Sequence, residues 1–260
     1  MAFPGFDLSG RVALITGGNG GIGLGMARGL AQAGCEICIW GTNPAKNESA
    51  LAELAGIGPK VSAFICDVAN EAAVETTFAA SLKTHGRIDG CFANAGVGGR
   101  NTAFDEMTTE EWDRVIGVNQ SGVFYTFRAA ARHMKERALH GDAFGRLVGT
   151  ASLAAISGQA RGEHYAQSKG GLVAMIKALA VEYARYNVTA HTLLPGWTET
   201  DMTQGAFSNP RFVENVFKRM PVRRWGKPAD FAAIAIYIMS ESSSFHTAET
   251  FLIDGGYFAY

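Results

Sequence analysis

The sequence has little cysteine, little proline, no excess of charge and no long apolar run. Its 260 residues include 4 cysteines and 7 prolines, too few for a disulfide scaffold or a proline-rich linker. The 23 basic and 24 acidic residues give a net charge of -1, which argues against a nucleic-acid partner. The longest apolar run covers only residues 231–239, whereas a membrane-spanning helix needs about 20 residues. We therefore expect neither a nucleic-acid partner nor a membrane-spanning segment.

The four cysteines and the start of the chain carry little functional signal. Cys35 and Cys38 have the C-x-x-C spacing of redox motifs, but they enter the apolar run 37–40, where residues three apart point to opposite faces of a strand. We predict buried structural thiols, with a redox or metal role as the less favoured alternative. The histidines show no ligand spacing, so no metal site is expected. The first ten residues lack the features of a signal peptide, which predicts a cytoplasmic protein.

What the chain does have is an alternation of short apolar runs with longer amphipathic segments, the pattern of a parallel sheet covered by helices. The apolar runs predict seven strands, at residues 12–16, 37–40, 61–66, 90–93, 146–150, 188–194 and 250–253. Helical patterns lie between them, at residues 22–33, 45–55, 70–85, 109–138, 162–186 and 228–240. We expect one α/β domain over residues 1–260, a Rossmann-like, doubly wound parallel sheet with helices on both faces. Only residues 198–226 break the alternation.

Glycine is plentiful, with 32 residues in 260. A cluster follows the first predicted strand, at the start of the predicted helix 22–33, and consists of Gly17, Gly18, Gly20, Gly21 and Gly23. Glycine lets the backbone approach a pyrophosphate closely, and the free amides at a helix start can bind it. The position between a strand and a helix favours a dinucleotide site, and the absence of Gly-Lys-Ser/Thr argues against an ATP-binding P-loop.

Two further strand ends fit the same cofactor, because ligands of such sheets bind beyond the carboxyl ends of the strands. Asp67 follows the third predicted strand, where its carboxylate could accept a hydrogen bond from an adenine amino group or cap the next helix. Asn94, Ala95 and Gly96 follow the fourth strand, where small residues would let a cofactor lie against the backbone. An ordinary turn is the alternative at that position.

A candidate catalytic group follows the fifth predicted strand. Ser152 comes just after it, and Tyr165 and Lys169 lie on the helical pattern 162–186. Positions i and i+4 share one helix face, so the Lys169 ammonium can stabilise the Tyr165 phenolate. Lowering the pKa of a tyrosine from about 10 by about two units takes roughly 2.7 kcal/mol, which a cation in a partly dry site can supply. Tyr165 would then act as a general acid or base.

In this order, these motifs resemble those of the short-chain dehydrogenase/reductase family in its compact, single-domain form. The resemblance covers essentially the whole chain and includes Asn119. It implies an NAD(P)-dependent oxidoreductase that transfers hydride between the nicotinamide and a secondary alcohol or ketone. In that reaction Tyr165 is the general acid or base and Ser152 holds the reacting oxygen. Lys169 assists Tyr165 and binds the nicotinamide ribose, and Asn119 holds a proton-relay water.

The resemblance also implies which residues contact NAD or NADP. They are Gly17, Asn19, Gly20, Gly21, Ile22, Gly23, Thr42, Asn43, Asp67, Val68, Asn94, Ala95, Gly96, Tyr165, Lys169, Pro195, Gly196, Trp197 and Thr198. An acidic residue at the end of the second strand would select NAD, but Gly41 stands there. Gly20 and Thr42 fill the positions where relatives carry the Arg or Lys that selects NADP. Since Lys46 could still reach a phosphate, both cofactors stay open.

Residues 197–227 correspond to the substrate-binding loop of the family and are rich in aromatic and apolar residues. We predict a lid that closes over the substrate, with short helices that simply pack on the domain as an equal alternative. The candidate substrate residues are Arg100, Ser152, Trp197, Met202 and Phe207. The chain looks similar to sugar-acid dehydrogenases acting on gluconate or 2-deoxygluconate. A 3-oxoacyl thioester reductase and a non-catalytic NAD(P)-binding sensor or scaffold are the alternatives.

The helical patterns 109–138 and 162–186 carry apolar residues on more than one face, among them Phe124 and Val181. A helix that is apolar on two sides suggests burial against another subunit. In the family the corresponding helices form a dimer interface within a tetramer. We therefore expect a homotetramer that acts on a small-molecule substrate.

Overall fold

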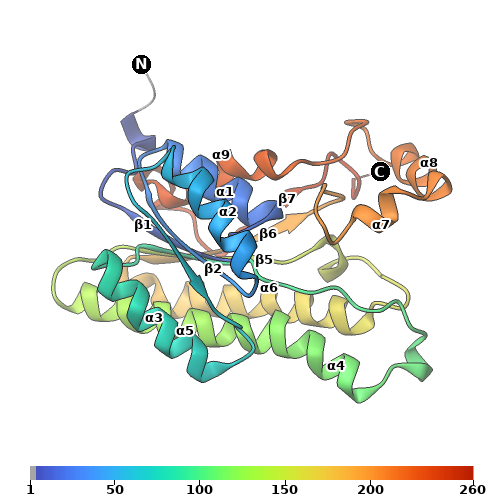
Figure 1. The fold of residues 1–260 in the computed structure, drawn as a ribbon, viewed down its shortest axis with the longest axis horizontal. Helices are drawn as coiled ribbons and strands as arrows, with labels where there is room; N and C mark the ends of the chain where they lie inside the picture. The colour runs from blue at the N-terminus through green and yellow to red at the C-terminus, as the bar shows by residue number, and fades with distance from the viewer. Residues whose placement is uncertain (1–3, 260) are drawn as a thin grey trace.

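The computed structural model describes residues 4–259, so residues 1–3 and 260 of the expected domain lie outside the described part. All strands belong to one parallel, seven-stranded sheet with the order β3-β2-β1-β4-β5-β6-β7 (Figure 1). The strands are β1 Val12–Thr16, β2 Glu36–Gly41, β3 Val61–Ile65, β4 Gly90–Ala93, β5 Gly145–Thr150, β6 Val188–Pro195 and β7 Thr250–Ile253. The order reverses between β1 and β4, which confirms the doubly wound prediction.

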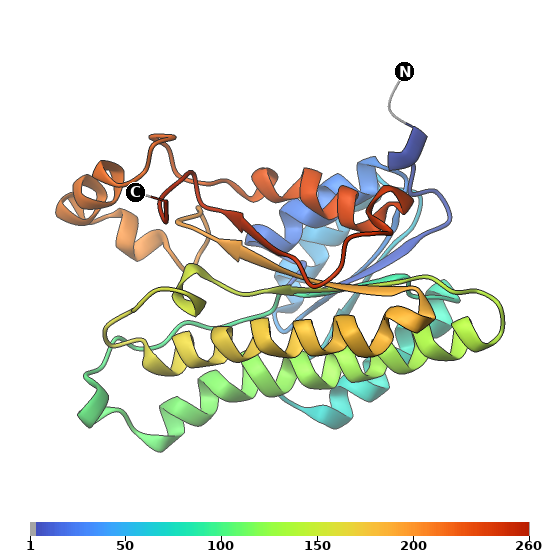
Figure 2. The ribbon, with the colours of Figure 1, turned by 180° about the vertical axis from the view of Figure 1, so that it is seen from behind.

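Three layers make up the molecule, with the sheet in the middle (Figures 1 and 2). One face is covered by α1 Gly21–Gln32, α2 Pro44–Ala55 and α9 Ala232–Met239. The other face is covered by α3 Glu71–His85, α5 Gly122–Leu139 and α6 Glu163–Tyr183. Every residue of β1 is buried, because Ala13 and Ile15 point into the first core and Val12 and Leu14 into the second.

Several helices begin with a side-chain cap, and at α3 the cap is Asn70 rather than Asp67. The side chains of Asn70 and Thr108 accept hydrogen bonds from the backbone three residues further on, at the starts of α3 and of α4 Thr109–Ile116. Asn43 caps α2 in the same way, by accepting from the amide of Lys46. Such caps stabilise a helix by about 1 kcal/mol each. Asn43, expected to contact the cofactor, therefore has a structural partner just after β2.

The predicted continuous helix 109–138 is wrong in one respect. After α4 the chain forms a π-helical turn over Gly117–Ser121 before α5 continues. A π turn holds one extra residue per turn and is frequent at functional sites. It places Asn119 fully buried beside the end of β4. The spacing of apolar residues in the sequence does not reveal such a turn, because the chain is helical on both sides of it.

The segment that breaks the alternation forms two short helices, α7 Gln204–Phe207 and α8 Pro210–Lys218. Asn209 caps α8, and Pro210 begins it. A backbone bridge between Thr198 and Gly226 joins the two ends of the segment. Both views place α7 and α8 together as a lobe at one end of the sheet (Figures 1 and 2). We call residues 197–227 the lid segment.

The four cysteines are free and buried, as predicted. Cys35 packs in the core beneath α1, and Cys38 packs in the opposite core. Burial raises the pKa of both thiols and so suppresses the reactive thiolate. Within residues 4–259, no helix is both long and apolar enough to cross a membrane. The same residues contain no cluster of three potential metal ligands.

Candidate active site

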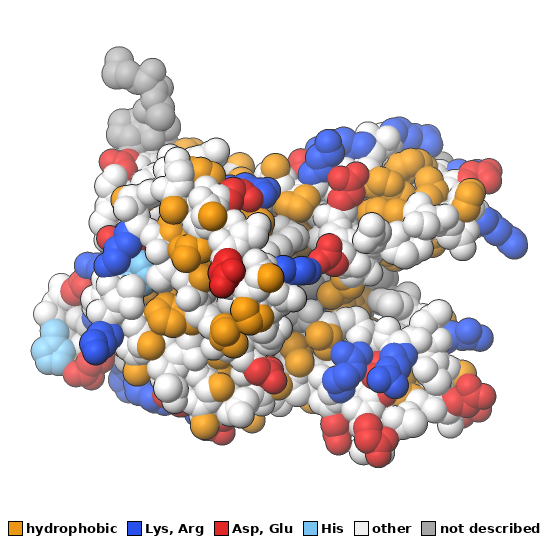
Figure 3. All heavy atoms as spheres, viewed as in Figure 1, with side chains coloured by type: hydrophobic (Ala, Val, Ile, Leu, Met, Phe, Trp, Pro, Cys, Tyr) orange, Lys and Arg blue, Asp and Glu red, His pale blue; other side chains and the backbone are white. Residues whose placement is uncertain are grey.

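A cleft of about 680 Å³ lies beyond the carboxyl ends of the central strands, between the β1–α1 loop and the lid segment. Figure 3 shows a notch between the lobe of α7 and α8 and the lobe of α4, with Lys and Arg side chains on both of its sides. The cleft brings together most of the predicted residues, namely Gly17, Asn19, Gly20, Gly21, Ile22, Asn94, Ala95, Gly96, Ser152, Tyr165, Lys169, Pro195, Gly196, Trp197, Thr198 and Met202. Its walls do not include Gly23, Thr42, Asn43, Asp67, Val68, Arg100, Asn119 or Phe207.

The glycine loop after β1 is shaped as a phosphate cradle. Gly17 and Gly21 have φ angles of +63° and +49°, which favour glycine. A Cβ on Gly23 would lie 2.3 Å from the carbonyl oxygen of Gly17. No side chain caps the start of α1, so its first amides can bind an anion. The residues present therefore fit the pyrophosphate of NAD(P).

The turn after β4 is fixed to this loop. The Thr16 hydroxyl accepts hydrogen bonds from the amides of Asn94 and Ala95, each at 3.0 Å. The Asn94 side chain donates to the carbonyl oxygens of Thr16 and Gly17. Sequence reasoning found Asn94 but missed Thr16. A threonine at the last position of a buried strand, facing a neighbouring strand end, was the available signal.

At the end of β2, the structure gives a reason for Gly41. A Cβ there would lie 2.1 Å from Nδ2 of Asn19, which donates to Oδ1 of Asn47 at 2.6 Å. Asn47 is buried and donates in turn to the carbonyl oxygens of Gly41 and Phe64. Sequence reasoning missed Asn47, although its spacing from Ala50 and Leu54 places it on the buried face of α2.

The rim at this end carries a cation. Nζ of Lys46 lies 2.5 Å from Oδ2 of Asp201, so α2 is linked across the cleft to the lid segment. Both residues line the cleft. Asp67, after β3, is exposed and accepts a hydrogen bond from the amide of Ala69, whereas Val68 packs in the core. No acidic side chain follows β2 directly, so the site is compatible with NAD and with NADP.

The candidate catalytic side chains meet where β5 and α6 face the cleft. Nζ of Lys169 lies 5.7 Å from the ring centre of Tyr165 and donates to the carbonyl oxygen of Thr150 at 2.8 Å. Burial lowers the pKa of Lys169 to about 8. Burial also raises the pKa of Tyr165, and a hydrogen bond with Ser152 opposes that rise. Lys169 thus remains largely protonated at pH 7, next to a phenol that needs a cation to ionise.

Asn119 lies behind this group and is bound to the loop after β4. Its Oδ1 accepts from the amide of Val97 at 2.8 Å, and its Nδ2 donates to the carbonyl oxygen of Val97 and the hydroxyl of Ser168. A Cβ on Gly96 would lie 3.2 Å from Oδ1 of Asn119 and 3.3 Å from Nζ of Lys169. The water relay expected of Asn119 stays a prediction, while its role in holding Val97 is visible.

The substrate end of the cleft differs from the expectation. Trp197 and Met202 line it, but Phe207 stacks on Trp225 with ring centres 4.0 Å apart, and Phe217 packs on the same indole. Phe207 therefore belongs to the internal core of the lid segment. Arg100 is exposed beyond Gly98 and Gly99, which line the cleft.

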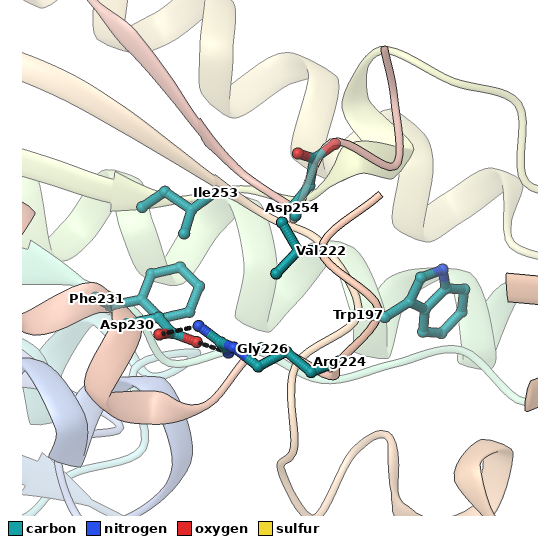
Figure 4. Close-up of a pocket in the computed structure, with 9 residues that line it drawn as sticks. Trp197, Val222, Arg224, Gly226, Asp230, Phe231, Ile253 and Asp254 are labelled. Atoms are coloured by element: carbon teal, nitrogen blue, oxygen red, sulfur yellow. Dashed lines mark hydrogen bonds and ion pairs between the residues drawn. The ribbon is translucent and has the colours of Figure 1, made fainter. Parts of the chain in front are cut away.

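A second cavity of about 280 Å³ lies behind the lid segment and shares Trp197 with the main cleft. Figure 4 shows the Arg224 guanidinium facing the Asp230 carboxylate, with Phe231 and Ile253 nearby. Two hydrogen bonds, of 2.7 and 2.8 Å, join Arg224 to Asp230. This ion pair fastens the end of the lid segment to the turn before α9.

Comparisons with known proteins agree with this geometry. The family model described as enoyl-(acyl carrier protein) reductase matches residues 17–258. The chain is 34% identical to 3-oxoacyl-(acyl-carrier-protein) reductase FabG of Chlamydia pneumoniae, over 96% of this chain and 97% of that protein. It is also similar to the structure of a gluconate 5-dehydrogenase from Burkholderia cenocepacia J2315 in complex with NADP and tartrate. The TM-score is 0.91, with 32% identity over 98% of both chains.

A short-chain type dehydrogenase/reductase from Mycobacterium marinum has a TM-score of 0.91 and 31% identity, again over 98% of both chains. The fold, the residues that line the cleft and the relatives all indicate the same family over nearly the whole sequence. The chain therefore belongs to the short-chain dehydrogenase/reductase family and is an NAD(P)-dependent oxidoreductase acting on an alcohol or ketone group.

Proposed function

We propose that the protein interconverts a small anionic hydroxy acid and its keto acid, of the sugar-acid class to which gluconate belongs. The observation that carries this proposal is the net positive charge of the lid segment, which borders the cleft through Trp197 and Met202 while its Lys and Arg side chains lie outside the cleft wall. Residues 197–227 hold six Lys or Arg and three Asp or Glu, whereas the whole chain has a net charge of -1. On the other side, the Arg100 side chain is 76% exposed next to the cleft wall, with its Nε 3.5 Å from Oε2 of Glu111. Such a field attracts a carboxylate.

The chemistry at the reacting carbon follows from the three side chains that meet there. Ser152 binds the carbonyl oxygen of the keto acid, and Tyr165 donates its phenolic proton to that oxygen during reduction. In the other direction Tyr165 takes the proton from the alcohol. Lys169 stabilises the phenolate electrostatically, and Asn119 keeps the loop after β4 beside it.

The cofactor fits the cradle that the glycines form. Gly17, Gly20 and Gly21 hold the pyrophosphate, and Pro195, Gly196 and Thr198 line the nicotinamide end. NAD(P), when bound, supplies or accepts the hydride at the reacting carbon. Asp67 lies outside the cleft wall, and we propose that its exposed carboxylate, one oxygen of which accepts a hydrogen bond from the amide of Ala69, meets the adenine.

We also propose that the chain forms one catalytic domain, that residues 197–227 act as its lid, and that it works as a cytoplasmic homotetramer. Two exposed apolar side chains on the covering helices support the assembly. Phe124 on α5 is 46% exposed and Val181 on α6 is 81% exposed. Light scattering of the purified protein tests the oligomeric state. We expect a tetramer, and a monomer would contradict the proposed assembly.

A second candidate is reduction of a 3-oxoacyl thioester on a carrier protein. The relative of that name is 34% identical to the chain, and a basic lid could also meet an acidic carrier. This activity would need an acyl chain to enter beside Trp197 and Met202, both of which line the cleft.

A rate comparison tests the two candidates. The oxidation of NADPH and of NADH is followed with 5-keto-D-gluconate, with the neutral 5-keto-D-fructose and with acetoacetyl-coenzyme A. We expect kcat/KM for the keto acid to exceed that for the neutral ketone at least about tenfold, the value of one charged hydrogen bond. Equal values for the acid and the neutral ketone would contradict the proposal, and a higher value for the thioester would favour the second candidate.

A further inference from the structure

In the segment after the Asn-Ala-Gly turn, each of residues 97–100 has its own side-chain contact. Four consecutive residues of the loop are each contacted by a different side chain from α4, the π turn or α6. The contacts are Asn119 on Val97, Arg114 on Gly98, His164 on Gly99 and Glu111 on Arg100. Gly98 and Gly99 line the cleft, so these contacts fix one of its walls.

Glu111 joins three of these contacts. The residue is 6% exposed, and Oε1 accepts hydrogen bonds from the amide of Arg100 and from Arg114, each at 2.9 Å. Oε2 accepts a further bond from Nε of Arg114 at 2.8 Å. Arg114 in turn donates to the carbonyl oxygen of Gly98 at 2.7 Å. A carboxylate held in this way forms strong, oriented hydrogen bonds.

His164 extends the network to the residue beside Tyr165. Its side chain is buried, and Nε2 lies 3.4 Å from Oε1 of Glu111. Its ring also fills the space where a side chain on Gly99 would lie, since a Cβ there would be 2.2 Å from Cε1 of His164. Glu111 thus contacts both the loop and the start of the helix that carries Tyr165.

The wall that these contacts hold faces the lid segment. A Cβ on Gly98 would lie 3.8 Å from Cγ of Met202, and both residues line the cleft with Tyr165. A substrate between Tyr165 and the lid segment must therefore pass this wall. Gly98 and Gly99 have no side chains that could fix the position of this wall.

We propose that Glu111 is a positioning residue for the substrate: through Arg114, His164 and the amide of Arg100, it holds residues 97–100 where they can orient the substrate against Tyr165. The proposal rests on the cleft being the active site described above. It assigns Glu111 no contact with the substrate or the cofactor. Its effect is expected in substrate binding, because the cofactor contacts other parts of the cleft.

The test compares Glu111→Ala, the isosteric Glu111→Gln and the control Glu110→Ala. Glu110 is the neighbouring glutamate on α4 and is exposed. Hydrogen exchange is measured on the peptide that covers residues 96–101, together with thermal stability and NADPH affinity. KM and kcat are measured with 5-keto-D-gluconate.

We expect Glu111→Ala to speed exchange of this peptide about tenfold and to raise KM about tenfold, the effect of losing a charged hydrogen bond. NADPH affinity and kcat should change less than about twofold. Glu111→Gln keeps an oxygen for the amide of Arg100 and should recover part of both effects. Glu110→Ala should match the unmodified protein.

Unchanged exchange in a folded Glu111→Ala variant would overturn the proposal. So would a parallel loss of thermal stability, NADPH affinity and kcat, which would mark Glu111 as a general structural residue. If the unmodified protein reduces no keto acid, the proposed sugar-acid function fails. The exchange of residues 96–101 then decides the positioning role by itself.

Discussion

The cofactor end and the substrate end of the cleft differ in what forms their walls. The cofactor end consists of backbone at the ends of buried strands, where β1, β4 and the glycine loop lie too close for added side chains. The substrate end is bordered by the short elements of the lid segment, in which Trp197 and Met202 line the cleft and Phe207 and Phe217 pack on Trp225. The first end can bind one kind of cofactor, whereas the second can change its shape by repacking a few side chains.

The difference predicts how each end responds to mutation. Backbone packed at van der Waals distance cannot accommodate an added methyl group without shifting. Aromatic contacts in a small peripheral cluster can be lost while the sheet stays intact. Substitutions at the cofactor end should therefore change cofactor affinity, and substitutions in the lid segment should change substrate KM.

The largest effect is expected where the two ends meet, at Tyr165→Phe. Loss of the phenolic hydroxyl removes the proton donor, so kcat should fall by a factor of about 10³, within the range of general acid-base catalysis. NADPH affinity, measured by fluorescence titration, should stay within about threefold, because the ring is kept. Turnover near the level of the unmodified protein would show that another group moves the proton.

The next largest effect is expected for Gly23→Ala. The new Cβ would lie 2.3 Å from the Gly17 carbonyl oxygen and 2.5 Å from Nδ2 of Asn94, so the cradle must open. We expect a loss of NADPH affinity of about 100-fold and of stability by about 1 to 3 kcal/mol. Gly20→Ala is the matched control for stability, since no protein atom lies within 4 Å of its Cβ and its φ of -176° suits any residue. Equal effects of the two variants would refute the close-packing explanation.

Trp225→Ala should have a smaller effect, and this effect should change the KM for the substrate rather than the affinity for the cofactor. It removes the indole that contacts Phe207 and Phe217, two ring pairs worth about 0.5 to 1.5 kcal/mol each. KM for the keto acid should rise about tenfold at constant NADPH affinity. Steady-state kinetics and titration measure the two values separately. A loss of NADPH affinity as large as the rise in KM would mean that the two ends are not independent.

The smallest effect is expected for Lys46→Ala at the rim. Exposed ion pairs such as Lys46 with Asp201 contribute only about 0 to 1 kcal/mol, so the fold should be unaffected. If the ammonium contacts a 2'-phosphate, affinity for NADPH falls about threefold to tenfold while affinity for NADH stays constant. Asp201→Asn, which frees Lys46, should not weaken NADPH. Equal losses for both cofactors in Lys46→Ala would rule out a phosphate contact.

The sequence predicts the cofactor end better than the substrate end for a physical reason. The central strands are buried on both faces and the partly exposed edge strands β3 and β7 are also mostly apolar, so all seven strands read as short apolar runs and are visible, with the glycine loop, without a structure. The π turn around Asn119, the pairing of Asn19 with Asn47 and the packing of Phe207 on Trp225 depend on contacts between distant residues. Glu111 escaped notice because an acidic residue in the first turn of α4 looks like an ordinary helix-start residue.

The most direct test of the central claim follows the transferred atom. Purified protein is incubated with 5-keto-D-gluconate and with NADPH that carries deuterium as the transferred hydrogen at C4. The hydroxy acid formed is analysed by mass spectrometry. The account predicts one deuterium on the new alcohol carbon, and no product above background with Tyr165→Phe. Unlabelled product, or labelled product formed equally well by Tyr165→Phe, would contradict direct hydride transfer with Tyr165 as the proton donor.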